Sequence, residues 1–411
     1  MKKITNSLDF SVDYDVVVAG AGMAGVAAAL ASARAGKKTA LVEKTIMNGG
    51  LATIGSVLYY LPISDIRHNQ VTFGIAEELL LASIKYGPGD VPDWKNKENT
   101  RYGVAFNPMS FVLAMDELLD NAGVALWYDT LLCGVEQEED GTVTGIVVEN
   151  KSGRGIIHAH SFVDATGDAD IAWRGGAPTQ DGENFLSIWG VGYSMEAAAK
   201  AVKDNDGTPL CQLIGWGSSD TGNGHPEGMP TFMGINGKDV SRFVVESRRL
   251  ALNAYKDLHA KNGRTSAFPA MLPTMPDYRM SRHIVGDYTL QTGEEFTQFD
   301  DSVGIVADWR GGKDLWSLPY RALTTKALPG VLTAGRCLGA HGQAWHVFRV
   351  IQAAAMSGEV AGLAAAMSAD RNVMPDALNV TDLQNELKKR SFLLDMRELG
   401  NLEVDVKVAN R

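Results

Sequence analysis

The sequence of 411 residues is poor in cysteine and has no excess of basic charge. Cys133, Cys211 and Cys337 lie far apart, and without a CxxC pair they exclude a disulfide framework, a zinc ribbon and an adjacent redox dithiol. We predict no metal site. The chain has 38 basic and 49 acidic side chains, a formal charge of −11, which gives no support for nucleic acid as a partner.

Long hydrophobic runs are also scarce. Residues 16–33 carry no charge, but their glycines divide them into a strand, a turn and a helix rather than one membrane span. Met1-Lys2-Lys3 resembles the start of a signal peptide, yet mixed polar residues follow it instead of an apolar run. We therefore expect a soluble, cytoplasmic protein. An apolar fraction of 45% supports two domains or one large domain with an insertion.

A glycine-rich turn, Gly20-Ala21-Gly22-Met23-Ala24-Gly25, organises the first part of the chain. It follows an apolar strand at 16–19 and opens a small-residue helix at 23–35, and a second strand follows at 39–42. In such a unit the first glycine permits the tight turn, the second admits backbone amides to a pyrophosphate, and the third allows close packing of the helix. The helix N-terminus adds free N–H groups for the same anion.

An acidic residue, Glu43, comes directly after the second strand. A carboxylate at this place accepts hydrogen bonds from ribose hydroxyls, and it disfavours a 2′-phosphate and hence NADP. Together with the glycine-rich turn it predicts a dinucleotide site. A glycine-rich turn that serves packing alone is the alternative.

The sequence pattern in the middle of the chain changes twice. Asn107-Pro108 starts a helix, and turns at Asp140-Gly141 and Ser152-Gly153 predict a three-stranded antiparallel meander over 131–159. An apolar strand then ends in Thr166-Gly167. Residues 175–321 look like a separate substrate or cap region, with a loop at 215–237 and strands at 282–288 and 303–309. We expect a helix at 240–258, with Val244, Ala251, Tyr255 and Leu258 inward.

The last hundred residues return to the first pattern. A strand at 331–334 leads into Gly335-Arg336, a glycine-rich loop at 339–346 and a long small-residue helix at 350–367. The N-terminus of that helix would offer N–H groups to an anion. The tail contains one more helix, with Thr381 and Gln384 at capping-box spacing.

These stretches resemble the FAD-dependent oxidoreductases of the glutathione-reductase-like fold, and most closely the branch related to fumarate reductase and succinate dehydrogenase flavoproteins. The resemblance is carried by residues 14–43, 49–53, 163–168, 318–321 and 332–337 with the helix after His346. It implies an α/β fold in which a Rossmann-like FAD-binding domain has a parallel sheet and a β-meander. An α+β substrate or cap domain is inserted in it. We assign 1–60, 105–174 and 322–370 to the FAD-binding domain, 61–104 and 175–321 to the cap, and 371–411 to a helical tail.

The resemblance also implies which residues hold FAD. The turn from Gly20 to Gly25 would bind the pyrophosphate, Glu43 with Lys44 the adenosine ribose, and the backbone of Val135 the adenine. The remaining contacts would come from Gly50, Leu51, Ala52 and Thr53 beside the ribityl chain and ring, Thr166 and Gly167 along the dinucleotide, Gly335 and Arg336 over the ribityl, and the amides of Val350 and Ile351 at the flavin O2. No motif requires a covalent bond, so we expect the FAD to be non-covalent.

Candidate catalytic side chains cluster in two places. His341 and His346 flank Trp345 in the loop before the last long helix, with Arg349 after them, and Arg282 lies in the cap. A histidine near the flavin could transfer the substrate proton, and an arginine could hold a substrate carboxylate. Each of them has a purely structural alternative, because single histidines are commonly hydrogen-bonded parts of the core.

The sequence thus predicts an FAD-dependent dehydrogenase or reductase that transfers hydride between flavin N5 and a small polar organic molecule. The alternatives are an oxidase that uses O2, a non-catalytic FAD-binding or electron-transfer subunit, and an enzyme that uses NAD alone. Aromatic hydroxylases of this fold carry Gly-Asp where Gly335-Arg336 stands, which disfavours a monooxygenase. The substrate and the electron donor or acceptor are not identified, and the oligomeric state stays open, a homodimer being a common arrangement.

Overall fold

A five-stranded parallel sheet forms the centre of the protein. In the computed structural model, which describes residues 7–90, 93, 103–218 and 220–409, the strand order is β19-β10-β2-β3-β6 with every neighbouring pair parallel. The strands are β2 (Val16–Ala19), β3 (Thr39–Val42), β6 (Ala125–Trp127), β10 (Ser161–Asp164) and β19 (Val331–Thr333). β2, β3 and β10 are buried at every position, which explains why their sequences show little polar alternation.

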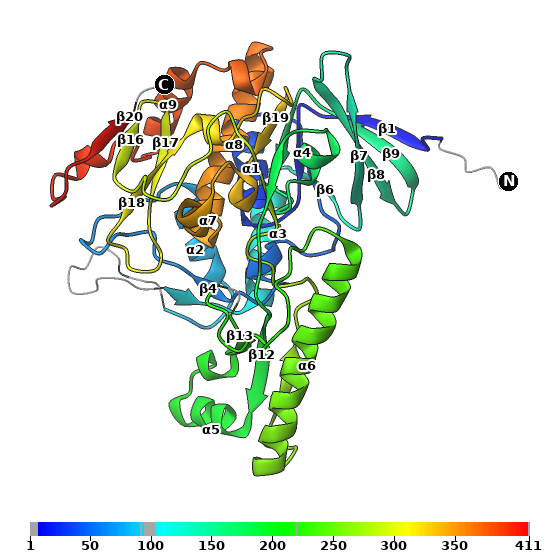
Figure 1. Ribbon diagram of the computed structural model, residues 1–411, viewed down its shortest axis with the longest axis vertical. Helices are drawn as coiled ribbons and strands as arrows, with labels where there is room; N and C mark the ends of the chain where they lie inside the picture. Colours follow the sequence, from blue (N-terminus) through cyan, green and yellow to red (C-terminus); the bar gives the residue numbers. More distant parts are fainter. Residues whose placement is uncertain (1–6, 91–92, 94–102, 219, 410–411) are drawn as a thin grey trace.

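Two small-residue helices pack closely on this sheet. They are α1 (Met23–Arg34) and α8 (Ile351–Arg371), which lie side by side in the middle of Figure 1. A Cβ atom added at Gly358 would come within 2.1 Å of the carbonyl oxygen of Ala24. Glycine at this crossing therefore allows the two helix backbones to approach each other. The predicted loop at 339–346 is wrong in part, because α7 (Gly342–Phe348) is a helix, bent by 84° from α8.

The predicted meander is confirmed and is larger than expected. It comprises β7 (Leu131–Gln137), β8 (Val143–Asn150) and β9 (Gly153–His158), all antiparallel. β1 (Phe10–Asp13) joins as a fourth strand, parallel to β9. The sequence analysis treated this N-terminal stretch as mixed and polar. Its burial alternates as a one-sided strand requires, and Phe10 stacks on Trp127 at 5.7 Å between ring centroids.

Two further helices, α2 (Ile75–Ile84) and α3 (Pro108–Asn121), pack against each other, and the second begins where the sequence predicted. They flank a short pair of strands, β4 (Tyr59–Tyr60) and β5 (Val104–Ala105). Asn107 caps α3 as predicted, since its side-chain oxygen accepts a hydrogen bond from the Ser110 N–H at 2.9 Å. The predicted cap segment 61–104 lies partly outside the described residues, and its boundaries stay a prediction.

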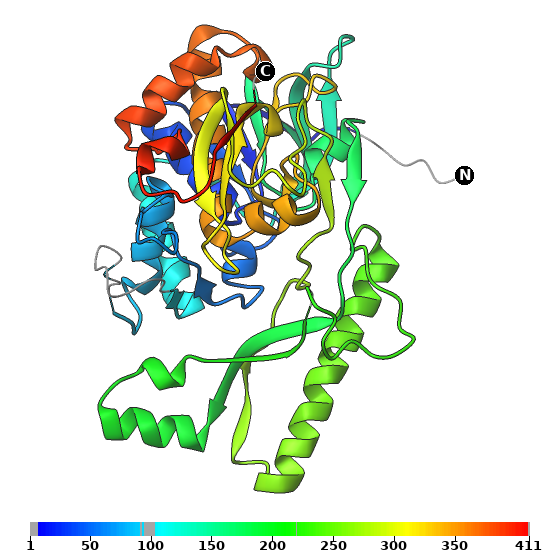
Figure 2. The same cartoon turned by 60° about the vertical axis from the view of Figure 1, so that its left-hand side comes forward.

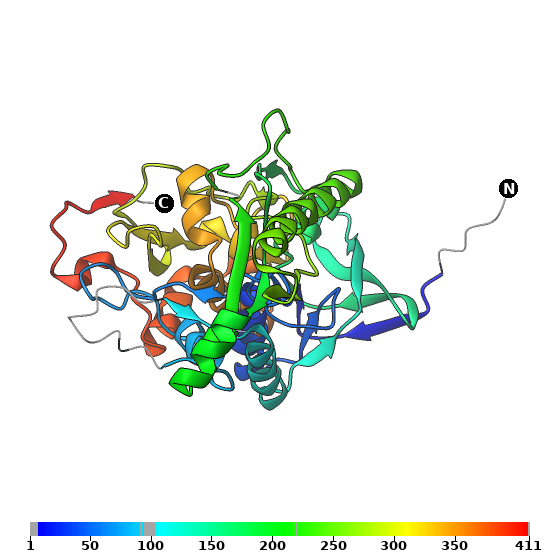
Figure 3. The same cartoon turned by 90° about the horizontal axis from the view of Figure 1, so that it is seen from below.

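An arm extends from the main body, as Figure 2 shows, and it faces the viewer in Figure 3. It contains the antiparallel sheet β13-β12-β14 with two helices, namely β12 (Ser187–Ser194), α5 (Met195–Asp204), β13 (Gln212–Gly217), α6 (Gly237–Asn262) and β14 (Ala267–Met271). The buried face of α6 was predicted correctly at Ala251 and Tyr255 and wrongly at Val244 and Leu258. Its fully buried positions are Phe243, Ser247, Ala251 and Tyr255, spaced by four residues, whereas Val244 and Leu258 are only half-buried.

The remaining elements pack around the body. β17 (Ser302–Ala307) and β18 (Leu315–Pro319) pair antiparallel and share one hydrophobic core with α1 and α8 through Val303 and Trp316. The others are α4 (Asp170–Arg174), β11 (Thr179–Asp181), β15 (Arg282–Ile284), β16 (Thr297–Phe299), α9 (Val380–Lys389) and β20 (Lys407–Ala409). The predicted capping box of the tail is wrong, because Asn379 caps α9 by accepting from the Thr381 N–H.

Among the described residues, no single helix is both long and apolar enough to cross a membrane, although the bent pair α7–α8 passes the same test of length and composition. The expected α/β class, with a parallel sheet, a meander and an additional region, is confirmed.

Candidate active site

The glycine-rich turn is shaped by backbone contacts. Gly20 has φ +92°, and a Cβ added there would lie 2.6 Å from the carbonyl oxygen of Ala165. A Cβ at Gly25 would lie 1.7 Å from the carbonyl oxygen of Gly20, so no side chain fits at either position. A Cβ at Gly22 would meet no atom within 4 Å. The loop is therefore tightly packed on both sides of Gly22 and open above it.

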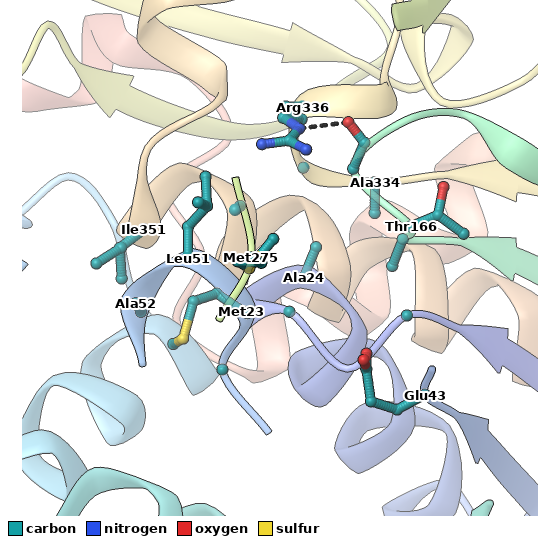
Figure 4. Close-up of a pocket in the computed structure, with 18 of the residues that line it drawn as sticks. Met23, Ala24, Glu43, Leu51, Ala52, Thr166, Met275, Ala334, Arg336 and Ile351 are labelled. Atoms are coloured by element: carbon teal, nitrogen blue, oxygen red, sulfur yellow. Dashed lines mark hydrogen bonds between the residues drawn. The ribbon is translucent and has the colours of Figure 1, made fainter. Parts of the chain in front are cut away.

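The open space above Gly22 belongs to a cavity of about 750 Å³. Figure 4 shows Glu43 toward one end of it and Ile351 toward the other, with Arg336 above. Fourteen residues predicted to hold FAD line this cavity, from six separate stretches of the chain: Gly20, Gly22, Met23, Ala24, Glu43, Lys44, Gly50, Leu51, Ala52, Thr166, Gly167, Gly335, Arg336 and Ile351.

A second cavity of about 380 Å³ continues from the first on the side of Glu43. The two share Gly20, Glu43, Lys44 and Thr166, so one elongated ligand could occupy both. Glu43 is 7% exposed, and its carboxylate accepts hydrogen bonds from the N–H groups of Ala21 and Thr45, each at 2.8 Å. These bonds fix the carboxylate where the two cavities meet.

Two helix N-termini face the larger cavity. α1 begins at Met23 and α8 at Ile351, and neither helix has a side-chain cap. The first N–H groups of a helix have no partner inside the helix, and they favour an anion or a carbonyl oxygen. The cavity therefore has one donor-rich place at the glycine-rich turn and a second at the start of α8.

Arg336 closes the upper side of the cavity. Its guanidinium donates to the carbonyl oxygens of Gly167 and Tyr278 and forms an ion pair with Asp168 at 3.0 Å. Burial alone would raise the pKa of Asp168, but the nearby charges of Arg336 and Lys44 hold it below its usual range. These partners hold the Arg336 side chain in place at the cavity wall, and Asp168 balances its positive charge.

The family comparison matches this geometry. The family model of FAD dependent oxidoreductases matches residues 15–187 and 216–387, which is most of the chain. The chain belongs to this family. It is an FAD-dependent oxidoreductase, FAD is its cofactor, and hydride transfer is the general chemistry that FAD supplies.

Individual relatives are more distant. A thioredoxin reductase from Ureaplasma parvum serovar 3 is 36% identical over 86 residues, which are 20% of this chain and 28% of that protein. The match thus spans little more than a quarter of the relative. Adenylylsulfate reductase from Archaeoglobus fulgidus is 13% identical, covering 92% of this chain and 73% of the other with a TM-score of 0.48. A flavocytochrome c3 fumarate reductase is 14% identical over 87% and 79%, with a TM-score of 0.40. These values do not bear on the substrate.

The cavity has the features that FAD needs. The bare Gly22 backbone leaves room for a pyrophosphate at the N-terminus of α1, and the carboxylate of Glu43 stands where a ribose would follow. The smaller cavity, lined by Thr130, Leu131 and Leu132 beside the meander, offers apolar side chains on which an adenine could pack. The assignment of these residues to parts of FAD stays a prediction.

Five predicted residues do not line either cavity. Val135 lies farther along β7, beyond a register shift between Leu132 and Gly134, so the meander meets the smaller cavity through Thr130–Leu132 instead. The others are next to the lining and support it: the Ala21 N–H bonds to Glu43, Gly25 packs on Gly20, Thr53 donates to the Asn48 carbonyl oxygen at 2.6 Å, and Val350 is the N-cap of α8.

None of the three predicted catalytic residues, Arg282, His341 and His346, lines the larger cavity. Arg282 is 6% exposed, stacks on Trp173, lies 3.5 Å from the carboxylate of Asp181 and donates to the carbonyl oxygen of Asp168 at 3.4 Å. His341 is the N-cap residue of α7 and lies 6.0 Å from His283, measured between ring centroids. Neither residue lines the cavity.

His346 lies close to the cavity through Arg349, which lines it. Nη2 of Arg349 bonds to Asp220 at 2.6 Å and donates to Nδ1 of His346 at 3.3 Å. Burial, and next the charge of Arg349, lower the pKa of His346, so its ring is neutral near pH 7. Burial also lowers the pKa of Arg349 to about 10, which still leaves the guanidinium charged.

Several lining residues were missed by the sequence analysis. They include Met275 of the cap, and Thr45, Gly49, Ile54, Ala165, Ala334 and Ala354, whereas Arg349 was named only as a neighbour of His346. Five of them adjoin or lie close to predicted positions, namely Gly49, Ile54, Ala165, Ala334 and Ala354. For these the sequence analysis chose the correct part of the chain but included too few residues. Met275 had no local signal, because it reaches the cavity only through the fold of the cap.

Proposed function

We propose that this FAD-dependent oxidoreductase acts as a dehydrogenase or reductase of a small polar molecule that carries a carboxylate or a similar anionic group. The observation that supports this best is the Nε atom of Arg349. It is buried without a hydrogen-bond partner, in a side chain that is 6% exposed and lines the cavity. A buried guanidinium N–H without a partner is costly, and a ligand carboxylate would satisfy it.

Two other arginines near Arg349 are held by partners within the protein. Arg336 is held by Asp168 and two carbonyl oxygens, and Arg279 is bound to Asp277 at 3.1 Å. Arg349 also has an acidic partner, Asp220, but that bond uses Nη2 and leaves Nε for a ligand. We therefore assign the substrate anion to Arg349, in place of the predicted Arg282.

We further propose that His346 exchanges the substrate proton. Its ring is neutral near pH 7 and touches Arg349, so a substrate bound at Arg349 would lie beside it. Nδ1 accepts from Arg349, which leaves Nε2 as the atom that carries or receives the proton. The predicted His341 has no comparable route to the cavity.

Non-covalent attachment of FAD also stays a proposal. Among the described residues, no histidine, cysteine or tyrosine lines either cavity. A covalent bond to the flavin through one of these side chains therefore has no support here. Denaturation with acid should release all of the yellow colour into the supernatant, and colour that stays with the precipitate would contradict the proposal.

The anion anchor can be tested by substitution of Arg349. We would screen small carboxylic and hydroxycarboxylic acids for anaerobic bleaching of the FAD-loaded protein, and then compare wild type with Arg349→Gln and Arg349→Lys. Loss of a charge-assisted contact should lower kcat/KM by about 10- to 100-fold in Arg349→Gln while FAD stays bound. Arg249→Gln, on the exposed surface of α6, is the matched control.

The alternatives give different results in the same experiment. An unchanged kcat/KM in Arg349→Gln would remove the anchor. Peroxide formed in step with substrate in air would favour the oxidase. A flavin that no compound of the screen reduces, in a protein that purifies with another chain, would favour the electron-transfer subunit. A colourless protein that binds NADH and cannot be loaded with FAD would contradict the family assignment itself.

A further inference from the structure

A third cavity, of about 350 Å³, lies in the cap beside the candidate active site, and we refer to it as the cap cavity. It is enclosed by α6, by the start of β12 and by residues 273–277. Its lining is mostly apolar with a few polar groups: Ser187, Ile188, Phe243, Val244, Ser247, Arg248, Pro273, Thr274, Met275, Pro276 and Asp277. An apolar lining with a few polar groups is typical of a pocket for part of a small ligand.

Two side-chain oxygens of residues that line the cap cavity make no hydrogen bond, and one of them, Oδ1 of Asp277, forms an ion pair with Arg279 at 3.1 Å. Ser247 is 3% exposed, and its Oγ makes no hydrogen bond. It lies between Phe243 and Ala251 on the buried face of α6. Buried hydroxyl groups are nearly always hydrogen-bonded, so an unsatisfied one in the wall of a cavity points to a ligand group that completes it.

The cap cavity and the larger cavity have one lining residue in common. Met275 lines both cavities, and Figure 4 shows it between Leu51 and Ala24 at the larger one. The neighbouring Thr274 donates its N–H to the carbonyl oxygen of Ile54 at 2.9 Å, which fixes the segment 273–277 to the FAD-binding body. A methionine side chain is flexible and apolar, so it can turn aside for a ligand that reaches from one cavity into the other.

We propose that the cap cavity binds the tail of the substrate and sets its length. The proposal rests on the proposed function, in which the carboxylate lies at Arg349. The tail would be an aliphatic chain that passes Met275 and packs on Ile188 and Phe243, and it would carry a hydroxyl or carbonyl group at the depth of Ser247. The preferred substrate class is therefore a medium-length hydroxy or oxo carboxylic acid rather than a compact acid.

Chain length gives the first test. FAD-loaded protein is titrated with straight-chain carboxylates from acetate to octanoate, and binding is followed by the change in the flavin absorbance. Each methylene that enters the cap cavity should tighten binding about fourfold, until the cavity is full. Ser247→Leu should abolish this gain and leave acetate binding unchanged, whereas Val245→Leu, at an exposed position of α6, should behave as wild type.

The hydroxyl of Ser247 gives the second test. Wild type should bind 6-hydroxyhexanoate about threefold to tenfold more tightly than Ser247→Ala does, while hexanoate should bind both proteins equally. Ser247→Ala removes only an unpaired hydroxyl, so the melting temperature and FAD content should not fall. The same two values measured for Ser247→Leu show whether that variant lost its chain-length effect through misfolding.

The outcomes separate this inference from the proposed function. Binding of all acids with one affinity would overturn the cap cavity as a tail site and leave Arg349 as the anchor. Failure of every acid to bind would overturn the anchor. In that case the uncharged series from ethanol to octanol is titrated in the same way: a chain-length effect that Ser247→Leu abolishes would support the cap cavity, and no effect would overturn it.

Discussion

Two glycines of one turn should respond to the same substitution in opposite ways. Gly22 and Gly25 are three residues apart, and alanine at either adds a single methyl group. At Gly22 φ is −67°, which any residue adopts, and the added Cβ would meet no protein atom within 4 Å. At Gly25 the same atom would lie 1.7 Å from the carbonyl oxygen of Gly20 and 2.9 Å from its carbonyl carbon.

The magnitudes follow from these contacts. Gly22→Ala should leave the FAD-free protein as stable as wild type, or about 0.4–1 kcal/mol more stable, because alanine restricts the unfolded chain. Gly25→Ala would push the backbone of Gly20 away from α1, and it should lower the free energy of unfolding by about 3 kcal/mol or more. FAD at a hundred times its Kd stabilises wild type by about 2.7 kcal/mol. Gly22→Ala should lose this gain, since its methyl group occupies the place of the pyrophosphate.

The assay is urea unfolding of each protein with and without excess FAD, combined with FAD titration. With FAD present, Gly22→Ala should be about 2 kcal/mol less stable than wild type, although without FAD it is not. Gly25→Ala should be less stable in both conditions. Wild-type FAD affinity in Gly22→Ala would refute the placement of the pyrophosphate above this glycine. Wild-type stability in Gly25→Ala would refute the close contact with Gly20.

Three further substitutions probe charged or polar groups. Glu43→Gln replaces an acceptor of two backbone N–H bonds, so it should weaken FAD binding and lower the free energy of unfolding by about 1–3 kcal/mol. The control, Glu139→Gln at an exposed position, should change neither quantity. FAD titration measures the first and urea unfolding the second. Glu359 is 2% exposed and burial raises its pKa to about 7, so the stability that it contributes is full below about pH 4.5 and is lost as the pH rises through 7. Glu359→Gln should therefore remove about 2–3 kcal/mol of the difference between unfolding at pH 5 and pH 8, and an unchanged slope would contradict the burial effect. His346→Gln should lower kcat by about 10²- to 10⁴-fold with FAD retained, and stopped-flow reduction at the wild-type rate would exclude it as the proton carrier.

The parts of the fold that were predictable are those in which local sequence and tertiary role coincide. The glycine-rich turn needs its glycines for the turn itself, so its sequence marks both the strand before it and the helix after it. The meander was readable because its two turns have strong local signals. β1 was not, because a short amphipathic strand at the edge of a sheet resembles a polar segment until its partner, β9, is known.

The part of the site that was not predictable depends on contacts between distant segments. The smaller cavity meets the meander at Leu131 and Leu132 rather than Val135, because the register of β7 shifts after Leu132 and no local signal marks such a bulge. The helix α7 brings His346 and Arg349 together with Asp220, which is 129 residues from Arg349 in the sequence. A histidine or arginine in a sequence does not indicate which acidic partner it will find.

The charges around Arg349 bear on the substrate that we propose. Arg336, Arg279 and Arg349 lie within electrostatic range of one another, as their mutual effects on neighbouring pKa values show. Each is paired with its own aspartate, so the region is nearly neutral in spite of three buried cations. A strongly polyanionic substrate would find little net attraction there, whereas a single carboxylate needs only the one N–H of Arg349 that has no partner. The pairing therefore favours a monoanion with an apolar remainder over a compact dianion, and this is the class of molecule that a mostly apolar cap cavity would accept.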